Sequence, residues 1–162
     1  MPTNASASTN QVSRFRVLVA DDDAGCRDSI VSLLSTDGFE ALSVEGGRAV
    51  IDLFRTQVRS REQAGARGSL IQRIHFLVVD YNMPDLTGLD VVRVLRSELS
   101  LELPSILVTA NFDDQLVRRF LSLGGFAVLP KPVEPVDFRE MVRKLVRTRL
   151  AAKGLFGRDR TG

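Results

Sequence analysis

Short apolar runs alternate with longer segments of helical period along most of this chain. The runs that read as strands are 15–20, 40–44, 76–79, 106–108 and 126–129. Between them, apolar residues recur at three- and four-residue steps, most regularly at Val91, Val92, Leu95 and Leu99. This alternation is typical of βαβ units built on a parallel sheet. Five strands and five helices predict an α/β fold with a doubly wound, five-stranded parallel sheet in the order 2-1-3-4-5.

Punctuating residues set the expected helix ends. Asp23 can cap the first helix, and Gly38 is placed to end it. The fourth helix is expected to end at Gly124-Gly125. The remaining helices are predicted to begin near Gly47, Gly88 and Pro135.

The 162 residues suffice for one domain, predicted to span 14–150. Residues 1–13 are Ser, Thr, Asn and Ala with little to bury, and we expect a disordered tail. Residues 151–162 are predicted to be a flexible basic tail. The connection 55–73 is long and basic and contains two glycines, so it is interpreted as an insertion with extra helix or a mobile loop.

The composition is that of a soluble globular protein, with 44% hydrophobic and 26% charged residues. No apolar run is long enough to cross a bilayer, and the first residues lack the features of a secretory signal. The single cysteine, Cys26, excludes an internal disulfide and fits a reducing cytoplasm. The single histidine, His75, excludes a His-rich metal site. A net charge of +2 is weak support for nucleic-acid binding.

Residues suited to phosphoryl chemistry follow four of the predicted strands. Asp21 and Asp22 follow the first strand, Asp80 the third and Thr109 the fourth, while Lys131 comes two residues after the fifth. Because the carboxyl ends of parallel strands meet in one crevice at the topological switch point, these side chains are expected to lie together.

This set can hold a divalent cation beside an Asp nucleophile. Mg²⁺ (or Mn²⁺) favours a few carboxylates with water, and without a cation such crowded carboxylates raise one another's pKa. With Mg²⁺ bound, Asp80 stays ionised and can attack phosphorus, while Lys131 and Thr109 meet the phosphoryl oxygens. Ala110 is small and leaves this approach open. Taken alone, Asp21 and Asp22 could equally be helix-capping or solvated residues, and it is the combination that carries the hypothesis.

Together these residues resemble the receiver domain of two-component response regulators. The resemblance rests on Asp21-Asp22, on Asp80 within Val-Val-Asp-Tyr-Asn-Met-Pro-Asp-Leu-Thr-Gly, on Thr109-Ala110 and on Lys131-Pro132. It implies a flavodoxin-like fold in a stand-alone, chemotaxis-regulator-like receiver. It further implies that Asp80 is the phosphoacceptor, that Asp22, Asp80 and the main-chain carbonyl of Asn82 ligate Mg²⁺, and that Asp21 acts largely through metal-bound water. The Lys131-Pro132 bond is similar to one that is cis in the family.

The chain departs from the family pattern before Lys131. Val128 and Leu129 stand where the family usually has an aromatic residue that rotates inward when the Thr shifts. Two positions after the acceptor and after Thr109, the resemblance assigns Asn82 and Asn111 to controlling the water that removes the phosphoryl group. His75 is interpreted as a surface or edge residue and Cys26 as a small packed hydrophobe, neither with a chemical role.

The leading hypothesis is a phosphoacceptor that catalyses only its own phosphorylation and dephosphorylation, and so is not an enzyme. Its partners would be a histidine kinase or phosphotransfer protein and an unknown downstream protein. One alternative is a haloacid-dehalogenase-like phosphohydrolase, since Asp21-Asp22-Asp23 offers the Asp-x-Asp pattern. Another is a binding adaptor that is never phosphorylated. Nucleic-acid binding through the basic fifth helix is disfavoured, because exposed helix faces are commonly basic.

Overall fold

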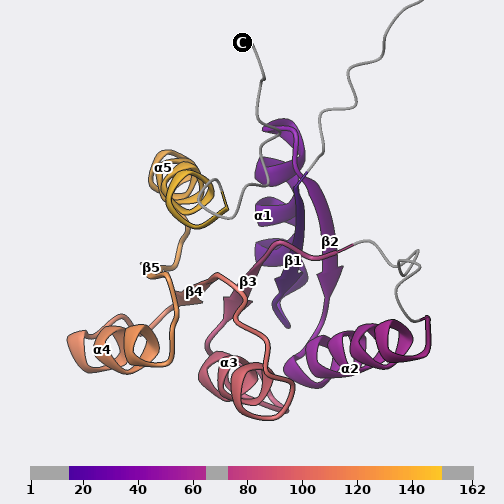
Figure 1. The fold of residues 1–162 in the computed structure, drawn as a ribbon. Coiled ribbons are helices and arrows are strands. Elements are labelled where there is room, and N and C mark those ends of the chain that lie inside the picture. Colours follow the sequence, from indigo (N-terminus) through magenta and orange to yellow (C-terminus); the bar gives the residue numbers. More distant parts are fainter. Residues whose placement is uncertain (1–14, 65–72, 151–162) are drawn as a thin grey trace, which may run out of the picture.

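The computed structural model describes residues 15–64 and 73–150 and contains one five-stranded parallel sheet (Figure 1). Its order, β2-β1-β3-β4-β5, confirms the prediction. The strands are β1 (Arg16–Ala20), β2 (Glu40–Val44), β3 (Phe76–Asp80), β4 (Ser105–Thr109) and β5 (Ala127–Pro130). The tails predicted at 1–13 and 151–162, and residues 65–72 of the predicted insertion, lie outside the described residues.

Helices cover both faces of the sheet. In Figure 1, α1 and α5 lie on one face and α2, α3 and α4 on the other. Their bounds are α1 (Ala24–Thr36), α2 (Gly47–Ala64), α3 (Gly88–Ser97), α4 (Asp114–Ser122) and α5 (Pro135–Leu145), the last continued by a π-helical turn, η1 (Val146–Leu150). Within the described ranges, no helix is long and apolar enough to span a membrane.

The sheet separates two hydrophobic cores. Leu77 and Leu107 pack with residues of α2, α3 and α4, whereas Phe76 and Ile106 pack with residues of α1 and α5. Every residue of β3 and β4 is buried, because successive side chains point to opposite faces and both faces are covered. The continuous apolar runs of the central strands follow from this burial.

The expected helix ends agree with the local chemistry. The Asp23 side chain accepts a hydrogen bond from Cys26 N at the start of α1, and Gly38 adopts a left-handed φ of 89° just after that helix. Gly124 has a φ of 87° after α4. At the start of α3, Thr87 and Asp90 form a reciprocal capping box.

The connection 55–73, interpreted as an insertion with extra helix or a mobile loop, is helical as far as Ala64. Residues 55–64 continue α2, which runs for 18 residues to Ala64. Arg55 binds Glu98 just beyond α3 at 3.0 Å, and Val58 is half-buried. Beyond Val58 the helix is polar, so the apolar spacing that predicted its first turns does not reach its end.

Candidate phosphoacceptor site

The strand register brings the predicted residues to one edge of the sheet. Ala20 of β1 pairs with Val79 of β3, so Asp21 and Asp80 follow adjacent paired positions. Asp80 in turn pairs with Val108, the residue before Thr109. The main-chain N–H of Lys131 donates to the Thr109 carbonyl at 2.7 Å and holds the end of β5 against β4.

The three predicted acidic residues form a cluster. One carboxylate oxygen from each of Asp21, Asp22 and Asp80 lies within 4.8 Å of the others. Asp21 is 1% and Asp80 4% exposed, whereas Asp22 is exposed. Buried carboxylates beside an exposed one fit a hard cation such as Mg²⁺, which takes oxygen ligands and keeps part of its water shell.

Lys131 neutralises part of this cluster. Its Nζ lies 3.0 Å from Asp21 Oδ2 and 3.2 Å from Asp80 Oδ1. Burial by itself would lower the pKa of Lys131, but the hydrogen bond to Asp21 and the charge of Asp80 outweigh it and raise that pKa. The ammonium group therefore stays charged at the position where negative charge is concentrated.

Asp80 holds its proton more tightly than an ordinary carboxyl group. Burial, followed by the Asp21 charge, raises the pKa of Asp80 to about 6, although Lys131 opposes the shift. The sequence-based expectation of raised pKa values among crowded carboxylates is thus correct for Asp80, with burial as the larger cause. A cation at this cluster would favour the ionised, nucleophilic form.

Two further contacts hold Asp21 in place. Its Oδ1 accepts a hydrogen bond from Asp23 N at 2.9 Å, and its carbonyl accepts one from the Arg27 guanidinium at 2.8 Å. Arg27 also lies 3.7 Å from Glu45. Arg27 was not predicted as part of the site, because an arginine on the first turns of a helix carries no signal for a contact with a main-chain carbonyl.

The remaining predicted residues line the same edge. Thr109 is completely buried, and its Oγ1 accepts a hydrogen bond from Asn111 N at 3.1 Å. Ala110, Asn111 and Asn82 are exposed, and Asn82 N lies 3.4 Å from Asp80 Oδ1.

The Lys131-Pro132 bond is cis, as the resemblance implied. Position 88 requires glycine, because the Cβ of any other residue would lie 2.6 Å from the Asp80 carbonyl oxygen.

His75 and Cys26 have structural surroundings. His75, interpreted as a surface or edge residue, is half-buried: its Nδ1 accepts a hydrogen bond from Arg16 N at 2.9 Å, and its ring packs edge-on against Phe15. Burial, with help from Arg73, lowers its pKa. Burial, followed by a hydrogen bond to Asp21, raises the pKa of the Cys26 thiol to about 11, so the reactive thiolate is disfavoured.

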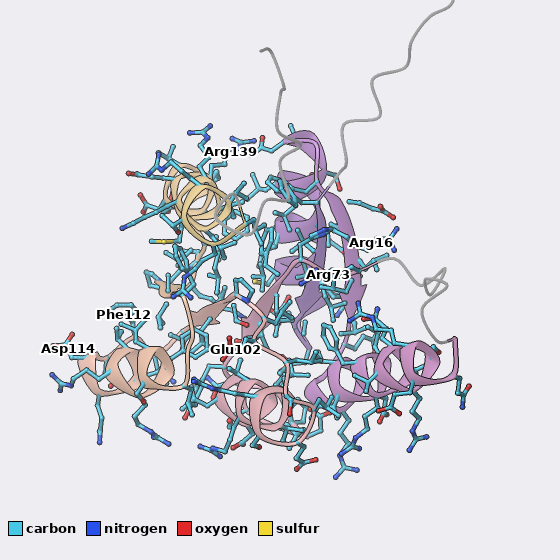
Figure 2. All side chains as sticks on the ribbon, viewed as in Figure 1. Arg16, Arg73, Glu102, Phe112, Asp114 and Arg139 are labelled. Atoms are coloured by element: carbon cyan, nitrogen blue, oxygen red, sulfur yellow. The ribbon has the colours of Figure 1, made fainter. Side chains whose placement is uncertain are left out.

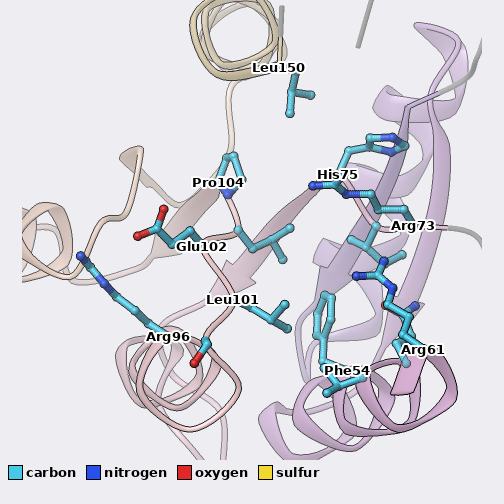
Figure 3. A pocket seen from close by; sticks show the side chains of 14 residues that line it. Phe54, Arg61, Arg73, His75, Arg96, Leu101, Glu102, Pro104 and Leu150 are labelled. Atoms are coloured by element: carbon cyan, nitrogen blue, oxygen red, sulfur yellow. The ribbon is translucent and has the colours of Figure 1, made fainter. Parts of the chain in front are cut away.

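A cavity of about 530 Å³ lies at the opposite end of the sheet (Figure 3). It is lined by Phe54, Leu101 and Pro104, with Arg61 and Arg73 at one side. Pro104 precedes β4 and Arg73 precedes β3, so the cavity is at the amino ends of these strands. It contains none of the predicted phosphoryl-transfer residues.

Comparison with known proteins matches this geometry to a family. Residues 17–143 match the model of the response regulator receiver domain. The chain belongs to the response regulator receiver domain family. The resemblance noted in the sequence is therefore confirmed at the level of the family.

Individual relatives span most of this chain. The two-component response regulator ORR3 of Oryza sativa subsp. indica is 26% identical over 131 residues, covering 80% of this chain and 89% of that protein. The response regulator MprA of Mycolicibacterium vanbaalenii is 32% identical over 134 residues, covering 82% of this chain but only 50% of that protein.

Solved structures share the fold. A CheY-like receiver domain from Methanospirillum hungatei JF-1 superposes with a TM-score of 0.70 at 19% identity, covering 86% of this chain and 98% of that one. A response regulator receiver protein from Pseudomonas putida gives a TM-score of 0.66 at 27% identity, covering 81% and 97%. The flavodoxin-like architecture of this chain is thus that of known receivers.

Proposed function

We propose that this chain is a phosphoacceptor of a two-component phosphorelay, in which Asp80 takes a phosphoryl group from a phosphohistidine. A carboxylate oxygen of Asp80 attacks phosphorus; an O–P bond forms, the N–P bond of the phosphohistidine breaks, and the imidazole leaves with the donor. The observation that carries the proposal is the buried Asp80 carboxylate, close to the Asp21 carboxylate and in contact with the Lys131 ammonium at the strand ends.

The acidic cluster supports a bound Mg²⁺ (or Mn²⁺). Asp22, Asp80 and the main-chain carbonyl of Asn82 would be its ligands, and Asp21 would act largely through metal-bound water. The cation would supply positive charge beside the transferring phosphoryl group and the crowded carboxylates. The exposure of Asp22 leaves room for the water molecules that Mg²⁺ retains.

The other residues act on the phosphoryl oxygens. The Lys131 ammonium, already 3.2 Å from Asp80, would bind one of them and offset the charge of the transition state. Thr109 can donate its hydroxyl to another while its oxygen continues to accept from Asn111 N. Ala110 is small and exposed, and would leave the approach of the phosphoryl group open.

Hydrolysis of the acyl phosphate returns the protein to its resting state. Asn82 and Asn111 would orient the attacking water through their side-chain amides, without acting as a general base. Both side chains are exposed, so a water can reach them. The protein thus catalyses only its own phosphorylation and dephosphorylation, and turns over no external metabolite.

The output would be a changed protein-binding surface around α4, β5 and α5. Phe112 (48% exposed), Leu121 (47%) and Val136 (75%) are apolar side chains open to solvent there. Figure 2 shows Phe112 beside Asp114 at α4. Phosphorylation adds charge and strong acceptors that can pull Thr109 inward and shift this surface between two states.

Two alternatives are less well supported. For a haloacid-dehalogenase-like phosphohydrolase, Asp23 would have to serve as the second Asp of the Asp-x-Asp pattern. Instead, its carboxylate caps α1 by accepting from Cys26 N at 2.9 Å. For a binding adaptor that is never phosphorylated, the complete acidic cluster and its contact with Lys131 would have no purpose.

The donor would be a histidine kinase or a phosphotransfer protein, acting on a receiver in the cytoplasm; the downstream target is unknown. Membrane insertion is not part of the proposal. The charges disfavour nucleic-acid binding, since the net charge is only +2 and Arg139 of α5 is paired with Asp37 at 2.9 Å.

A stoichiometry experiment tests this function against the phosphohydrolase. The protein is incubated with Mg²⁺ and acetyl phosphate, and separately with a generic phosphate ester such as p-nitrophenyl phosphate. A receiver gains one phosphoryl group per chain from acetyl phosphate, measured by intact mass, and releases no nitrophenol catalytically. Sustained nitrophenol release without a stable mass increase would favour the phosphohydrolase.

A further inference from the structure

Asp85 caps a helix that begins 38 residues before it in the chain. Its Oδ1 accepts hydrogen bonds from Gly47 N at 3.1 Å and from Leu86 N at 2.8 Å, and its Oδ2 accepts one from Arg48 N at 2.9 Å. Gly46, which precedes α2, has no side chain with which to cap it. The loop between β3 and α3 therefore supplies the N-terminal cap of α2.

The packing at this contact explains two adjacent glycines. A Cβ on Gly46 would lie 2.9 Å from Asp85 Oδ2, and a Cβ on Gly47 would lie 2.8 Å from the Cβ of Leu86 and 2.7 Å from a methyl of Val91. The start of α2 and the β3–α3 loop are thus in close contact. Side chains at these two positions would force them apart.

The same loop carries Asn82, the proposed carbonyl ligand. Its ends are fixed, because Tyr81 N donates to Val108 O at 2.8 Å and Gly88 N donates to Tyr81 O at 3.0 Å. Within 82–87, Asn82 N makes only a long contact of 3.4 Å to Asp80. Among the described residues, the hydrogen bonds that tie 82–87 to an element other than β3 or α3 are those of Asp85.

We propose that Asp85 is a positioning residue for phosphoryl transfer, which anchors the β3–α3 loop to α2 and so fixes the main-chain carbonyl of Asn82. This inference rests on the proposed function. The Asp85 carboxylate accepts from main-chain amides of Gly47, Arg48 and Leu86, and is not among the proposed ligands of the cation. Without its carboxylate, residues 82–84 would sample more conformations, and the carbonyl would have to be ordered when Mg²⁺ binds.

The competing explanation is that Asp85 only stabilises α2. To separate the two, Asp85→Ala is compared with Asp113→Ala. The second change removes the side-chain cap of α4, in which Asp113 Oδ1 accepts a hydrogen bond from Leu116 N at 2.7 Å. Both variants lose a helix cap, but only Asp85 lies in the loop of Asn82. Asp85→Asn, which keeps one acceptor oxygen, is the conservative variant and also serves if Asp85→Ala does not fold.

Three readouts do not depend on phosphorylation. Tyr81 adjoins Asp80 and is the single tyrosine of a chain without tryptophan, so its fluorescence reports Mg²⁺ titration. Amide exchange at Asn82 and Met83 in metal-free buffer reports the loop itself. A urea titration measures stability.

We expect Asp85→Ala to raise the Mg²⁺ dissociation constant about tenfold, the lower end of the effect of losing a group that orients a ligand, and to speed exchange at Asn82 and Met83.

In Asp113→Ala, the urea midpoint should fall to a similar extent while Mg²⁺ affinity and loop exchange stay at wild-type values; Asp85→Asn should lie between. If Asp85→Ala loses stability but keeps wild-type Mg²⁺ affinity and exchange at 82–83, Asp85 is a helix cap only and the inference fails. If the wild type is not labelled by acetyl phosphate, the proposed function fails instead, and metal-free loop exchange still decides whether Asp85 anchors the loop.

Discussion

The ammonium nitrogen of Lys131 lies 3.0 Å from a carboxylate oxygen of Asp21, although the two residues are 110 positions apart. They come from the loops after β5 and β1, which are separated in the sheet by β3 and β4. The Lys131 side chain extends across the carboxyl ends of these strands and also contacts Asp80, which ends β3. The ion pair therefore links distant strand ends around the proposed acceptor.

The raised pKa of Asp80 predicts a pH-dependent cost in stability. Because the pKa of Asp80 is about 6 in the folded protein, the native state binds a proton more tightly than the unfolded chain, whose ordinary value is 3.8. Stability should therefore fall as pH rises from about 4 to 6 and stay low above that window. In metal-free buffer at pH 7.5, Asp80→Asn should be more stable than wild type by about 1–3 kcal/mol, measured by urea unfolding.

The same comparison at pH 4 is the control, since the wild-type carboxyl is then largely protonated and the difference should shrink. Adding Mg²⁺ at pH 7.5 should stabilise the wild type selectively, because the ion binds its native carboxylates. Equal stability of the two proteins at pH 7.5 without metal would contradict the inference that ionised Asp80 destabilises the metal-free native state.

Asp22 provides a test of the metal site. Asp22→Ala removes a proposed ligand, and should weaken Mg²⁺ binding and slow phosphorylation together. Titration of Tyr81 fluorescence with Mg²⁺ measures the first effect, and labelling by acetyl phosphate the second. Asp28→Ala, which removes an exposed carboxylate from α1, is the matched control and should behave as wild type. An unchanged affinity in Asp22→Ala would mean that Asp22 is only a solvated residue.

Asn82 and Asn111 should set the lifetime of the phosphorylated protein. Replacing either with leucine obstructs the attacking water, so decay should slow several-fold while phosphorylation remains possible. Decay is followed by radiolabel or by mass after the donor is removed. Gln115→Leu, on the exposed side of α4, tests for a general effect of added apolar surface. Decay at the wild-type rate in both Asn variants would remove these residues from control of the water.

The output surface can be located with a phosphate mimic. When beryllofluoride and Mg²⁺ bind, amide exchange should change at 109–115 and along 126–146. We expect a modest change, because the half-buried Val128 stands where the family usually has a rotating aromatic residue. If exchange changes only within 55–73, the output surface lies there and the assignment to α4, β5 and α5 is wrong.

The fold was predictable because burial leaves a direct record in the sequence. The central strands are buried on both faces and read as continuous apolar runs, while α3 shows its buried face at Val91, Val92 and Leu95. The second half of α2 leaves no such record, because its polar residues contribute little to the core. The apolar pattern of α4 predicts a buried side chain at Leu121, but this residue is 47% exposed.

The proposed site residues were predictable where chemistry coincides with strand ends, as for Asp80, Thr109 and Lys131. Their supporting contacts were not. Arg27 binds the main-chain carbonyl of Asp21, and Asp85 accepts from main-chain amides of a distant helix. Every residue type has a main-chain carbonyl, and nearly every one has a main-chain amide, so the sequence does not show which residues are the partners.

The central claim is that Asp80 is the phosphoacceptor, and site-specific labelling tests it most directly. Wild type and Asp80→Asn are treated with acetyl phosphate and Mg²⁺, and intact mass is followed by peptide mapping of the modified residue. The account predicts one phosphoryl group on the wild type, carried by the peptide that contains Asp80, and none on Asp80→Asn, whose amide cannot attack phosphorus in the same way. Equal labelling of Asp80→Asn would contradict it.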